Sequence, residues 1–395
     1  MQNKTQIKTK LIPKLRFKEF EDEWEKKKIR NVSSFLDSKR IPLSQSERKT
    51  KKGKYPYYGA SGIIDYVEDY IFDGEYILLG EDGANILMRN SPLAFLASGK
   101  FWVNNHAHVI KANESNKFLA ESLERIRYDK YNTGTAQPKL NAEVCKNIII
   151  PIPTIQEQQK IATFLTAVDT KLQQLGQKKE LLANYKKGVM QQLFSQQLRF
   201  KNDDSSDFPD WEEKKLGEIG NIVSGLTYSP KDIVDKKNGV LVLRSSNVKK
   251  GKLSFKDNVY VKVDRFNPVI KDDILICVRN GSKRLIGKNA IINTETQGVA
   301  FGAFMSIYRS EFNKYLFHYF SSYNYKKEVH KNLGATINSI NGSDLKKFKV
   351  PFPSLKEQQK IANYLSAIDK KNTTIQTQID KTQAFKKGLL QGMFV

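Results

Sequence analysis

The hexapeptide EQQKIA occurs twice in the chain, starting at Glu157 and again at Glu357. When each residue is aligned with the residue 200 positions later, segments 151–169 and 351–369 are identical at 11 of 19 positions. The same register aligns "YKKGVMQQLF" with "FKKGLLQGMF" further along each half, without a gap. This period is far longer than the ~20–50 residues of solenoid repeats. The chain is therefore predicted to be a tandem duplication of one large structural unit.

The repeated segments are predicted to form long helices. Thr154 and Ser354 are suitable N-caps, and a glutamate follows each of them three residues later, as in a capping box. About 40 helical residues would span roughly 60 Å. Apolar residues then recur at alternating steps of four and three, which is the heptad pattern of a coiled coil. In the two copies they are Ile161, Leu165, Val168, Leu172, Leu175, Leu182, Val189 and Leu193, and Ile361, Leu365, Ile368, Ile375, Ile379, Leu389 and Met393.

Neither helix can bury its apolar stripe alone, but each has an equivalent partner in the other half. We therefore expect the two helices to pair in antiparallel orientation, with a pseudo-two-fold axis between them. Lys179, Asn372 and Thr382 interrupt the heptads and would help to fix the register of pairing. The alternative is that each helix only covers its own globular region.

Two globular regions, residues 20–150 and 205–350, have similar beginnings but different interiors. "LRFK" precedes a Trp-Glu pair in both regions, at Trp24 and at Trp211. Inside them, short apolar runs broken by Gly, Asp and Asn predict strands and turns. Helices are expected near residues 117–130 and 311–332. The predicted fold class is α+β (mixed α/β), with domains at 1–150 and 201–350 and helical segments at 151–200 and 351–395.

The net charge of +24 is spread over the whole chain and is not confined to a tail. A polyanionic partner, most often nucleic acid, is the natural interpretation, and a lysine-rich composition without such a partner is the alternative. The sequence has no run of 18 apolar residues, so no membrane span is predicted. Its N-terminal stretch is polar and does not predict a secretory signal. Cys145 and Cys277 are interpreted as reduced thiols of a cytoplasmic protein.

The sequence contains no catalytic constellation that we can defend. The segment "NNHAH" would place His106 and His108 on one face of a strand. Such a pair could bind a metal, but a hydrogen-bonding strand is the favoured interpretation because no further ligand lies at metal-binding spacing. We therefore expect no metal site in the chain.

The duplicated set of motifs resembles the specificity subunits of type I restriction-modification systems. The resemblance rests on the paired "P-x-P…EQQKIA…L…D" segments, the "KKG…F" helix ends and the "W-E-x-K-K" domain starts, and it covers nearly the whole chain. It implies two target-recognition domains separated by an antiparallel coiled coil, each domain reading one half of a split DNA sequence. It also implies two modification subunits, which carry the S-adenosylmethionine chemistry, docked on the repeated segments, and restriction subunits that join this complex.

Polar and basic loops are the expected readers of double-stranded DNA, because phosphate contacts give affinity and base-edge contacts give choice. The loop "RNGSKR" (279–284) is the strongest single candidate, although an ordinary basic turn remains an alternative. In the first domain the predicted DNA-binding residues are Tyr57, Tyr58, Ser61, Asn104, Asn105 and His106. In the second they are Thr227, Tyr228, Ser229, Arg244, Ser246, Asn247, Arg279, Asn280, Ser282, Lys283 and Arg284.

The first turns of the repeated helices are the predicted docking sites for partner subunits, with simple helix capping as the alternative. These docking residues are Glu157, Gln158, Gln159, Glu357, Gln358 and Gln359. Two other functions stay open at this point. One is a coiled-coil scaffold that binds acidic proteins, and the other is an enzyme that acts on nucleic acid by itself.

Overall fold

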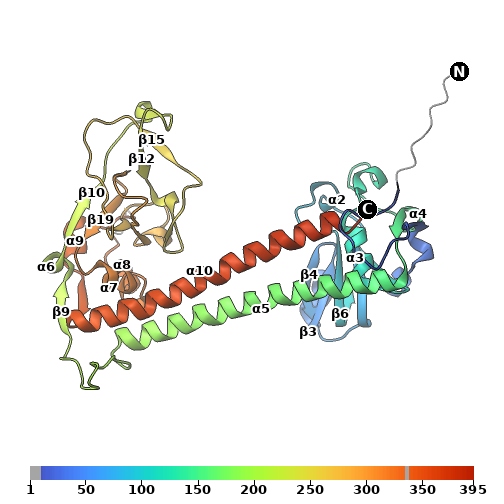
Figure 1. Ribbon diagram of the computed structural model, residues 1–395, viewed down its shortest axis with the longest axis horizontal. Coiled ribbons are helices and arrows are strands. Elements are labelled where there is room, and N and C mark those ends of the chain that lie inside the picture. The colour runs from blue at the N-terminus through green and yellow to red at the C-terminus, as the bar shows by residue number, and fades with distance from the viewer. Residues whose placement is uncertain (1–9, 334–337) are drawn as a thin grey trace. The chain divides into compact units, whose positions relative to one another are not determined.

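The computed structural model describes residues 10–333 and 338–395. Contacts divide the chain into two compact units, one formed by Met1–Gly176 with Thr377–Val395 and the other by Gln177–Gln376. We call them unit 1 and unit 2. Each unit combines one globular region with the first part of one long helix and the last part of the other (Figure 1).

The globular region of unit 1 is built around a six-stranded sheet in which only the β3–β6 pair is parallel. Successive side chains of a strand point to opposite faces of a sheet. Ile77 and Leu79 accordingly belong to one apolar cluster and Leu78 to another, so both faces are covered. In spatial order the strands are β2 (Ser33–Phe35), β7 (Ala107–Ala112), β5 (Phe72–Gly80), β6 (Ala94–Val103), β3 (Lys52–Gly59) and β4 (Gly62–Val67).

Short helices and a two-stranded ribbon complete this region. The ribbon joins the start of the region to its end, because β1 (Glu25–Lys28) pairs with β8 (Ile149–Ile152). The predicted helix near residues 117–130 is confirmed as α3 (Asn116–Glu124). The remaining turns and helices are η1 (Ile29–Asn31), η2 (Asp37–Lys39), α1 (Gln45–Thr50), α2 (Asn85–Met88), η3 (Tyr128–Tyr131) and α4 (Ala142–Asn147).

The globular region of unit 2 contains two four-stranded sheets. The first has the order β10-β19-β16-β17 and is antiparallel, whereas β12 and β18 of the second sheet are parallel. Residues of β16 alternate between two apolar clusters, as those of β5 do in unit 1. The strands are β10 (Asn221–Ser224), β19 (Met305–Arg309), β16 (Ile274–Cys277) and β17 (Asn289–Ile291), then β11 (Ile233–Val234), β15 (Val259–Val261), β12 (Val240–Leu243) and β18 (Ala300–Phe301).

Here too a ribbon closes the region, with β9 (Glu212–Lys215) paired to β20 (Lys349–Phe352). The predicted helical patch near residues 311–332 is confirmed as α7 (Asn313–Tyr319) and α8 (Tyr323–Lys331). The predicted strand-and-turn patterns are confirmed as well, so the fold class is mixed α/β. The remaining elements are α6 (Leu216–Ile219), η4 (Pro230–Asp232), η5 (Ser245–Asn247), β13 (Val248–Lys249), β14 (Lys252–Leu253), η6 (Lys283–Leu285) and α9 (Gly342–Lys346).

The two predicted long helices are confirmed as α5 (Ile155–Phe194) and α10 (Leu355–Gly392), of 40 and 38 residues. Their heptad positions are all buried or half-buried. In unit 1 the start of α5 and the end of α10 pack into the core of the globular region, through residues such as Leu165 and Met393. In unit 2 the end of α5 and the start of α10 do the same, through Leu193 and Leu365.

Within each unit the two helices also contact each other. In unit 2, Lys186 binds both carboxylate oxygens of Asp369 at 2.6 Å, and Lys179 donates to Gln376. One residue number rises as the other falls, so the helices run in opposite directions there. In unit 1, Lys386 contacts Asp169 at 2.7 Å, which is the same pairing displaced by 200 residues.

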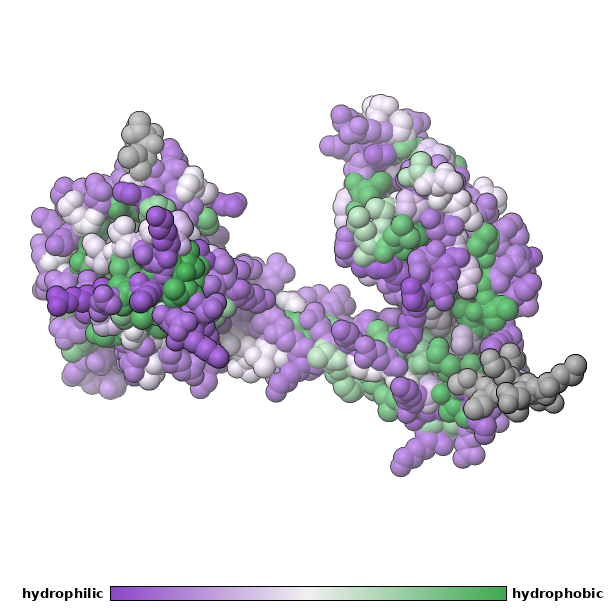
Figure 2. Space-filling view, turned by 90° about the horizontal axis from the view of Figure 1, so that it is seen from above, coloured by the Kyte–Doolittle hydropathy of each residue, from purple (hydrophilic) through white to green (hydrophobic). Residues whose placement is uncertain are grey.

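Hydrophilic residues cover most of the visible surface of both units, with hydrophobic patches between them (Figure 2). Cys145 and Cys277 are both buried and unpaired, which confirms the prediction of free thiols. No helix within the described part of the chain is long and apolar enough to cross a membrane.

Candidate nucleic-acid interface

A basic, exposed loop of unit 2 connects β16 to β17 and begins at Arg279. Its backbone is held at several points. The Arg279 N–H donates to the carbonyl of Phe304 at 3.2 Å, and the Ser282 N–H donates to the Asn280 side chain at 3.1 Å. The Asn280 amide also donates to the Ser245 hydroxyl at 2.8 Å, which ties the loop to the η5 turn. The loop is thus ordered before any ligand arrives.

The cations of this loop are free to bind an anion. The Arg279 guanidinium lies 5.6 Å from the centroid of the Phe304 ring, and Phe304 itself is 56% exposed. Such stacking holds the planar guanidinium in one orientation. Within the described residues, neither Arg279 nor Arg284 forms an ion pair with a carboxylate. Arg244 differs, because it is paired with Asp257 at 3.0 Å.

A cavity of about 500 Å³ adjoins this loop. Phe304, the residue on which Arg279 stacks, forms part of the cavity wall. Four of the predicted DNA-binding residues line it, namely Thr227, Tyr228, Arg244 and Ser246. Ser229 caps the neighbouring η4 turn. The structure therefore brings most of the second-domain residues together, although they come from three separate stretches of sequence.

The prediction is not supported for Asn247, which is fully buried. Its amide nitrogen donates to the carbonyls of Ser254 at 2.9 Å and Asp257 at 3.2 Å. Its side-chain oxygen accepts the N–H of Arg244 at 2.9 Å. Asn247 is therefore an internal brace that shapes the η5 turn, and it does not present a side chain to DNA.

In unit 1, the predicted residues Ser61, Asn105 and His106 are exposed. Strands β3 and β6 are parallel, so the turns that follow them lie at the same edge of the sheet. Ser61 lies in the first turn, and Asn105 and His106 lie in the second. His106 is oriented by Asp82, whose carboxylate lies 2.8 Å from its ring nitrogen. This edge is the corresponding polar surface of unit 1.

Three other predicted residues of unit 1 have structural roles. Tyr57 is fully buried, and its hydroxyl accepts the N–H of Leu43 at 2.9 Å. Asn104 is buried and its side chain accepts the N–H of His106 at 2.8 Å. Tyr58 is half-buried, with its ring against Phe101. The prediction is therefore wrong for Tyr57 and Asn104, whose side chains are not available to base edges, and Tyr58 offers only a partly exposed ring.

His108 is buried behind this edge, in β7, whereas His106 lies in the exposed turn before that strand, so the prediction that both histidines share one strand face is wrong. One ring nitrogen lies 2.7 Å from the Asp37 carboxylate and the other 2.9 Å from the Leu140 carbonyl. Both neighbours are acceptors, so only the doubly protonated ring can donate to both. Burial lowers the pKa of His108, but the hydrogen bond and charge of Asp37 outweigh it and raise the pKa to about 10. Both nitrogens are occupied, which agrees with the hydrogen-bonding interpretation and not with metal binding.

The first turns of α5 and α10 are too deeply buried to serve as the predicted docking sites as a whole. Glu157 is fully buried and accepts two hydrogen bonds from Arg16, each 2.8 Å long. Glu357 is equally buried and accepts from Arg199 at 3.2 and 2.9 Å. The "LRFK" echo noted in the sequence supplies both arginines. We call these two ion pairs the arginine clamps.

The glutamines next to the clamps divide into two groups. Gln158 and Gln358 are buried and donate to the carbonyls of Pro153 and Pro353, at 3.1 and 2.8 Å. Of the six predicted docking residues, only Gln159 and Gln359 are exposed. The docking prediction is therefore corrected for the two glutamates and for Gln158 and Gln358, since a side chain used inside its own unit has no free surface to offer a partner.

The capping boxes predicted at these turns are half present. The backbone N–H of Glu157 reaches the Thr154 hydroxyl at 3.4 Å, as that of Glu357 reaches the Ser354 hydroxyl. The glutamate side chains bind the arginines of the clamps and are not directed to the N-cap residues. Among residues 10–333 and 338–395, no group of three or more His, Cys, Asp or Glu side chains is placed to hold a metal ion.

Phe304 and Asp257 are site residues that the sequence-based selection missed. Phe304 lies in the apolar stretch "GVAFGAFMSIYRS", whose pattern predicts a buried strand. Its exposure beside Arg279 depends on where β18 ends and β19 begins. Asp257 is acidic and was not sought in a basic surface, although it orients Arg244 through their ion pair.

Two basic globular regions, each joined to matching parts of two long helices, define a modular protein with two related units. A family model described as "Type I restriction modification DNA specificity domain" matches the chain twice, at residues 21–183 and 209–382. These matches cover most of the chain. The chain therefore belongs to the type I restriction-modification DNA specificity family, and it contains two copies of the family's domain.

Individual relatives agree with the family match over most of their length. A putative type I restriction enzyme specificity subunit of Haemophilus influenzae is 28% identical, over 88% of each chain. The type I restriction enzyme MjaVIII specificity subunit of Methanocaldococcus jannaschii is 26% identical, over 88% of this chain and 86% of the relative. The crystal structure of a type I restriction-modification S subunit from M. genitalium has a TM-score of 0.65 at 18% identity, covering 97% of this chain and 99% of that one. That structural likeness concerns the fold alone.

Proposed function

We propose that this chain is the DNA sequence-specificity subunit of a type I restriction-modification complex. Each globular domain, 1–150 and 201–350, reads one half of a bipartite target in double-stranded DNA. The observation that carries the proposal is the family's DNA specificity domain matched twice in one basic chain. The two matches share their helix contacts but differ in their exposed loops, as expected if two readers of different sequences are mounted on equivalent supports.

The helical segments 151–200 and 351–395 form, in this proposal, an antiparallel two-helix coiled coil with pseudo-two-fold symmetry. Support comes from contacts that recur in the two halves of the chain. Lys186 with Asp369 repeats as Lys386 with Asp169, at an offset of 200 residues. The arginine clamps repeat as well, with their glutamates 200 residues apart and their arginines 183 residues apart. A helix pair of this kind fixes the number of base pairs between the two half-sites, because its length sets the separation of the readers.

Catalysis is assigned to partner subunits. Two modification subunits, which hold S-adenosylmethionine, dock on the repeated segments and methylate the target. Restriction subunits join through that complex. The chain itself contributes sequence choice and assembly, and holds no cofactor.

Sequencing of DNA modification in cells tests this proposal. We expect adenine methylation at one split motif in cells that contain this chain with its modification subunit. Deletion of this chain alone should abolish the methylation, and a plasmid copy should restore it. An unchanged methylation pattern after deletion, with an active modification subunit present, would contradict the proposed function.

Within unit 2, Arg279 is the residue for which we expect the clearest effect on choice. Its guanidinium is exposed, stacked on Phe304 and without a carboxylate partner among the described residues, so two of its N–H groups can donate to O6 and N7 of a guanine. Arg279→Ala should cost about 1–3 kcal/mol of discrimination at one base pair. The same sequencing should then show methylation at motifs degenerate at one position of one half-site.

Arg265→Ala is the matched control for this variant. Arg265 is also exposed, lies in the same unit, and has no ion pair among the described residues. It should leave the motif unchanged. If Arg279→Ala lowered methylation uniformly at all motifs without degeneracy, Arg279 would be a phosphate contact and not a base reader.

A further inference from the structure

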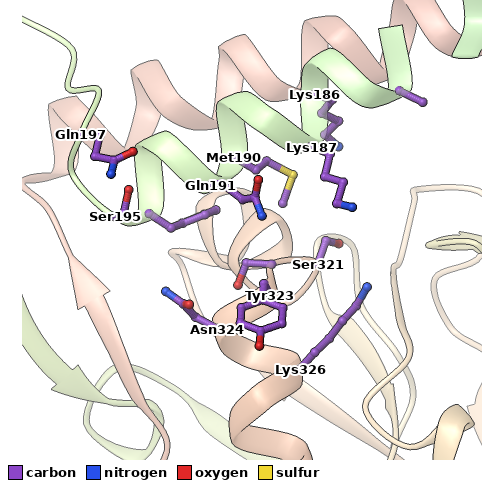
Figure 3. A pocket seen from close by; sticks show the side chains of 13 residues that line it. Lys186, Lys187, Met190, Gln191, Ser195, Gln197, Ser321, Tyr323, Asn324 and Lys326 are labelled. Atoms are coloured by element: carbon purple, nitrogen blue, oxygen red, sulfur yellow. The ribbon is translucent and has the colours of Figure 1, made fainter. Parts of the chain in front are cut away.

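A cavity of about 810 Å³ lies in unit 2 between the end of α5 and the start of α8. Figure 3 shows Lys187 and Gln191 extending from α5 toward the side chains of Tyr323 and Lys326. Met190 and Phe194 supply an apolar floor, and both are buried. The remaining lining is uncharged apart from Lys186 and polar apart from Ala183, and no carboxylate lines the cavity.

A second cavity, of about 370 Å³, lies at the corresponding helix end in unit 1, the end of α10, where Leu172 of α5 and Arg125 complete its wall. Lys387 and Gln391 replace Lys187 and Gln191 in it. Leu390 takes the place of Met190, and no carboxylate lines this cavity either. The third cation again comes from the globular region, as Arg125 in unit 1 and Lys326 in unit 2. We call the two cavities the twin basic pockets.

Two of the three cations in each pocket are available to a ligand. Lys186 is already neutralised by Asp369 at 2.6 Å, and Lys386 by Asp169 at 2.7 Å. Within the described residues, Lys187, Lys326 and Lys387 have no carboxylate partner. Arg125 forms no ion pair and stacks on a ring, 5.4 Å from the Phe394 centroid, although the charge of Glu121 lies nearby. Each pocket therefore presents two cations that are not committed to an ion pair, above an apolar floor.

We propose that each twin basic pocket binds an acidic segment of a modification subunit, one copy of that subunit per pocket. The inference rests on the proposed function, in which two such subunits bind one chain. Carboxylates of the segment pair with the two free cations, and an apolar side chain of the segment covers the Met190 or Leu390 floor. Because the lysine–lysine–glutamine set is the same in both units, both pockets suit the same partner.

DNA backbone is the less suitable occupant. A phosphodiester carries charge but has no apolar group to fill a floor made of Met190 and Phe194, and phosphate contacts need no cavity. An acidic peptide segment satisfies both features at once. Charge complementarity also fits the strongly positive balance of this chain.

The test uses the full chain assembled with its modification subunit. Lys187→Glu should abolish binding of one partner copy and Lys387→Glu the other, so that the mass of the complex falls by one partner in each case. The double variant should bind neither copy at concentrations that saturate the wild type. At each altered site we expect the dissociation constant to rise at least about tenfold, as for charge reversal at a buried interfacial pair.

Lys171→Glu with Lys371→Glu is the matched control. These lysines are also exposed, also repeated at an offset of 200 residues, and lie on the same two helices outside both pockets. The control should keep two partner copies. Lys326→Glu provides an independent check from the globular side of the unit 2 pocket and should remove one copy.

Three results would overturn the inference. If the Lys187→Glu/Lys387→Glu chain still held two partners with unchanged affinity, the pockets would not be docking sites. If that variant assembled normally but bound all DNA sequences more weakly, the pockets would be phosphate sites. If even the wild-type chain bound no modification subunit, the proposed function would fail together with this inference, which separates that case from the first two.

Discussion

Replacing Arg16 with alanine should destabilise unit 1 by about 3–5 kcal/mol, because it leaves a buried carboxylate without its partner. The Glu157 side chain is 1% exposed and receives both of its ionic hydrogen bonds from Arg16. The same arginine also donates to the carbonyl of Asp22 at 2.6 Å, so it joins the segment before β1 to the first turn of α5. Its loss should therefore open that turn as well as lower stability.

The equivalent change in unit 2, Arg199→Ala, should cost less. The Trp211 indole N–H donates to Glu357 at 2.8 Å and would remain after the change. Within the described residues Trp24, its counterpart in unit 1, has no hydrogen bond from its indole nitrogen. One retained donor lowers the penalty of a buried charge, so the two clamps should differ although the sequence repeats them.

Hydrogen exchange measured by mass spectrometry can follow both variants, since it reports the opening free energy of each unit separately. Arg127→Ala is the control, because the Arg127 side chain is 75% exposed and its pair with Asp129 should contribute little. Adding Glu157→Gln to Arg16→Ala should restore part of the stability, as removal of both charges costs less than removal of one. Protection equal to that of Arg127→Ala would contradict the clamp.

Replacing Phe394 with alanine should destabilise unit 1 by about 3–5 kcal/mol. The Phe394 ring is buried and packs at 5.4 Å from Phe118 and 6.2 Å from Trp24, measured between ring centroids. It anchors the end of α10 in the core of the globular region. A cavity at this position removes the anchor as well as the buried area, so exchange should rise first in the last turns of α10.

Phe194→Ala should have the matching effect on the end of α5, because the Phe194 ring packs against Tyr315 and Tyr319 in unit 2. Phe385→Ala serves as the control on the same helix as Phe394, since that residue is 54% exposed. It should change exchange only slightly. If Phe385→Ala and Phe394→Ala destabilised unit 1 equally, burial of the Phe394 ring would not be the cause of its effect.

The long helices were predictable from the sequence, because the signals that define a helix are local. N-caps, the absence of proline and heptad spacing all lie within a few residues of one another, and α5 and α10 follow them closely. Strands and turns of the globular regions were predictable for the same reason. The partner of Glu157 was not, because Arg16 lies 141 residues away in the sequence.

The predicted DNA-binding residues show the same division. Polar residues in turn sequences were correctly placed in loops, and the loop that begins at Arg279 is exposed as expected. Tyr57 and Asn247 have the same kinds of side chain in the same kinds of sequence, yet both are buried. Nothing in their local sequence distinguishes a residue that faces solvent from one that braces its own turn.

By itself, the sequence determined that the chain has two related halves, two long helices and two mixed α/β regions with a strong positive charge. Tertiary structure decided which polar groups remain available to partners. It committed Glu157 and Glu357 to internal clamps, exposed Phe304 beside Arg279, and formed the twin basic pockets. The physical reason is that helix and strand periodicity is encoded over a few residues, whereas burial of a polar side chain depends on segments brought together from distant parts of the chain.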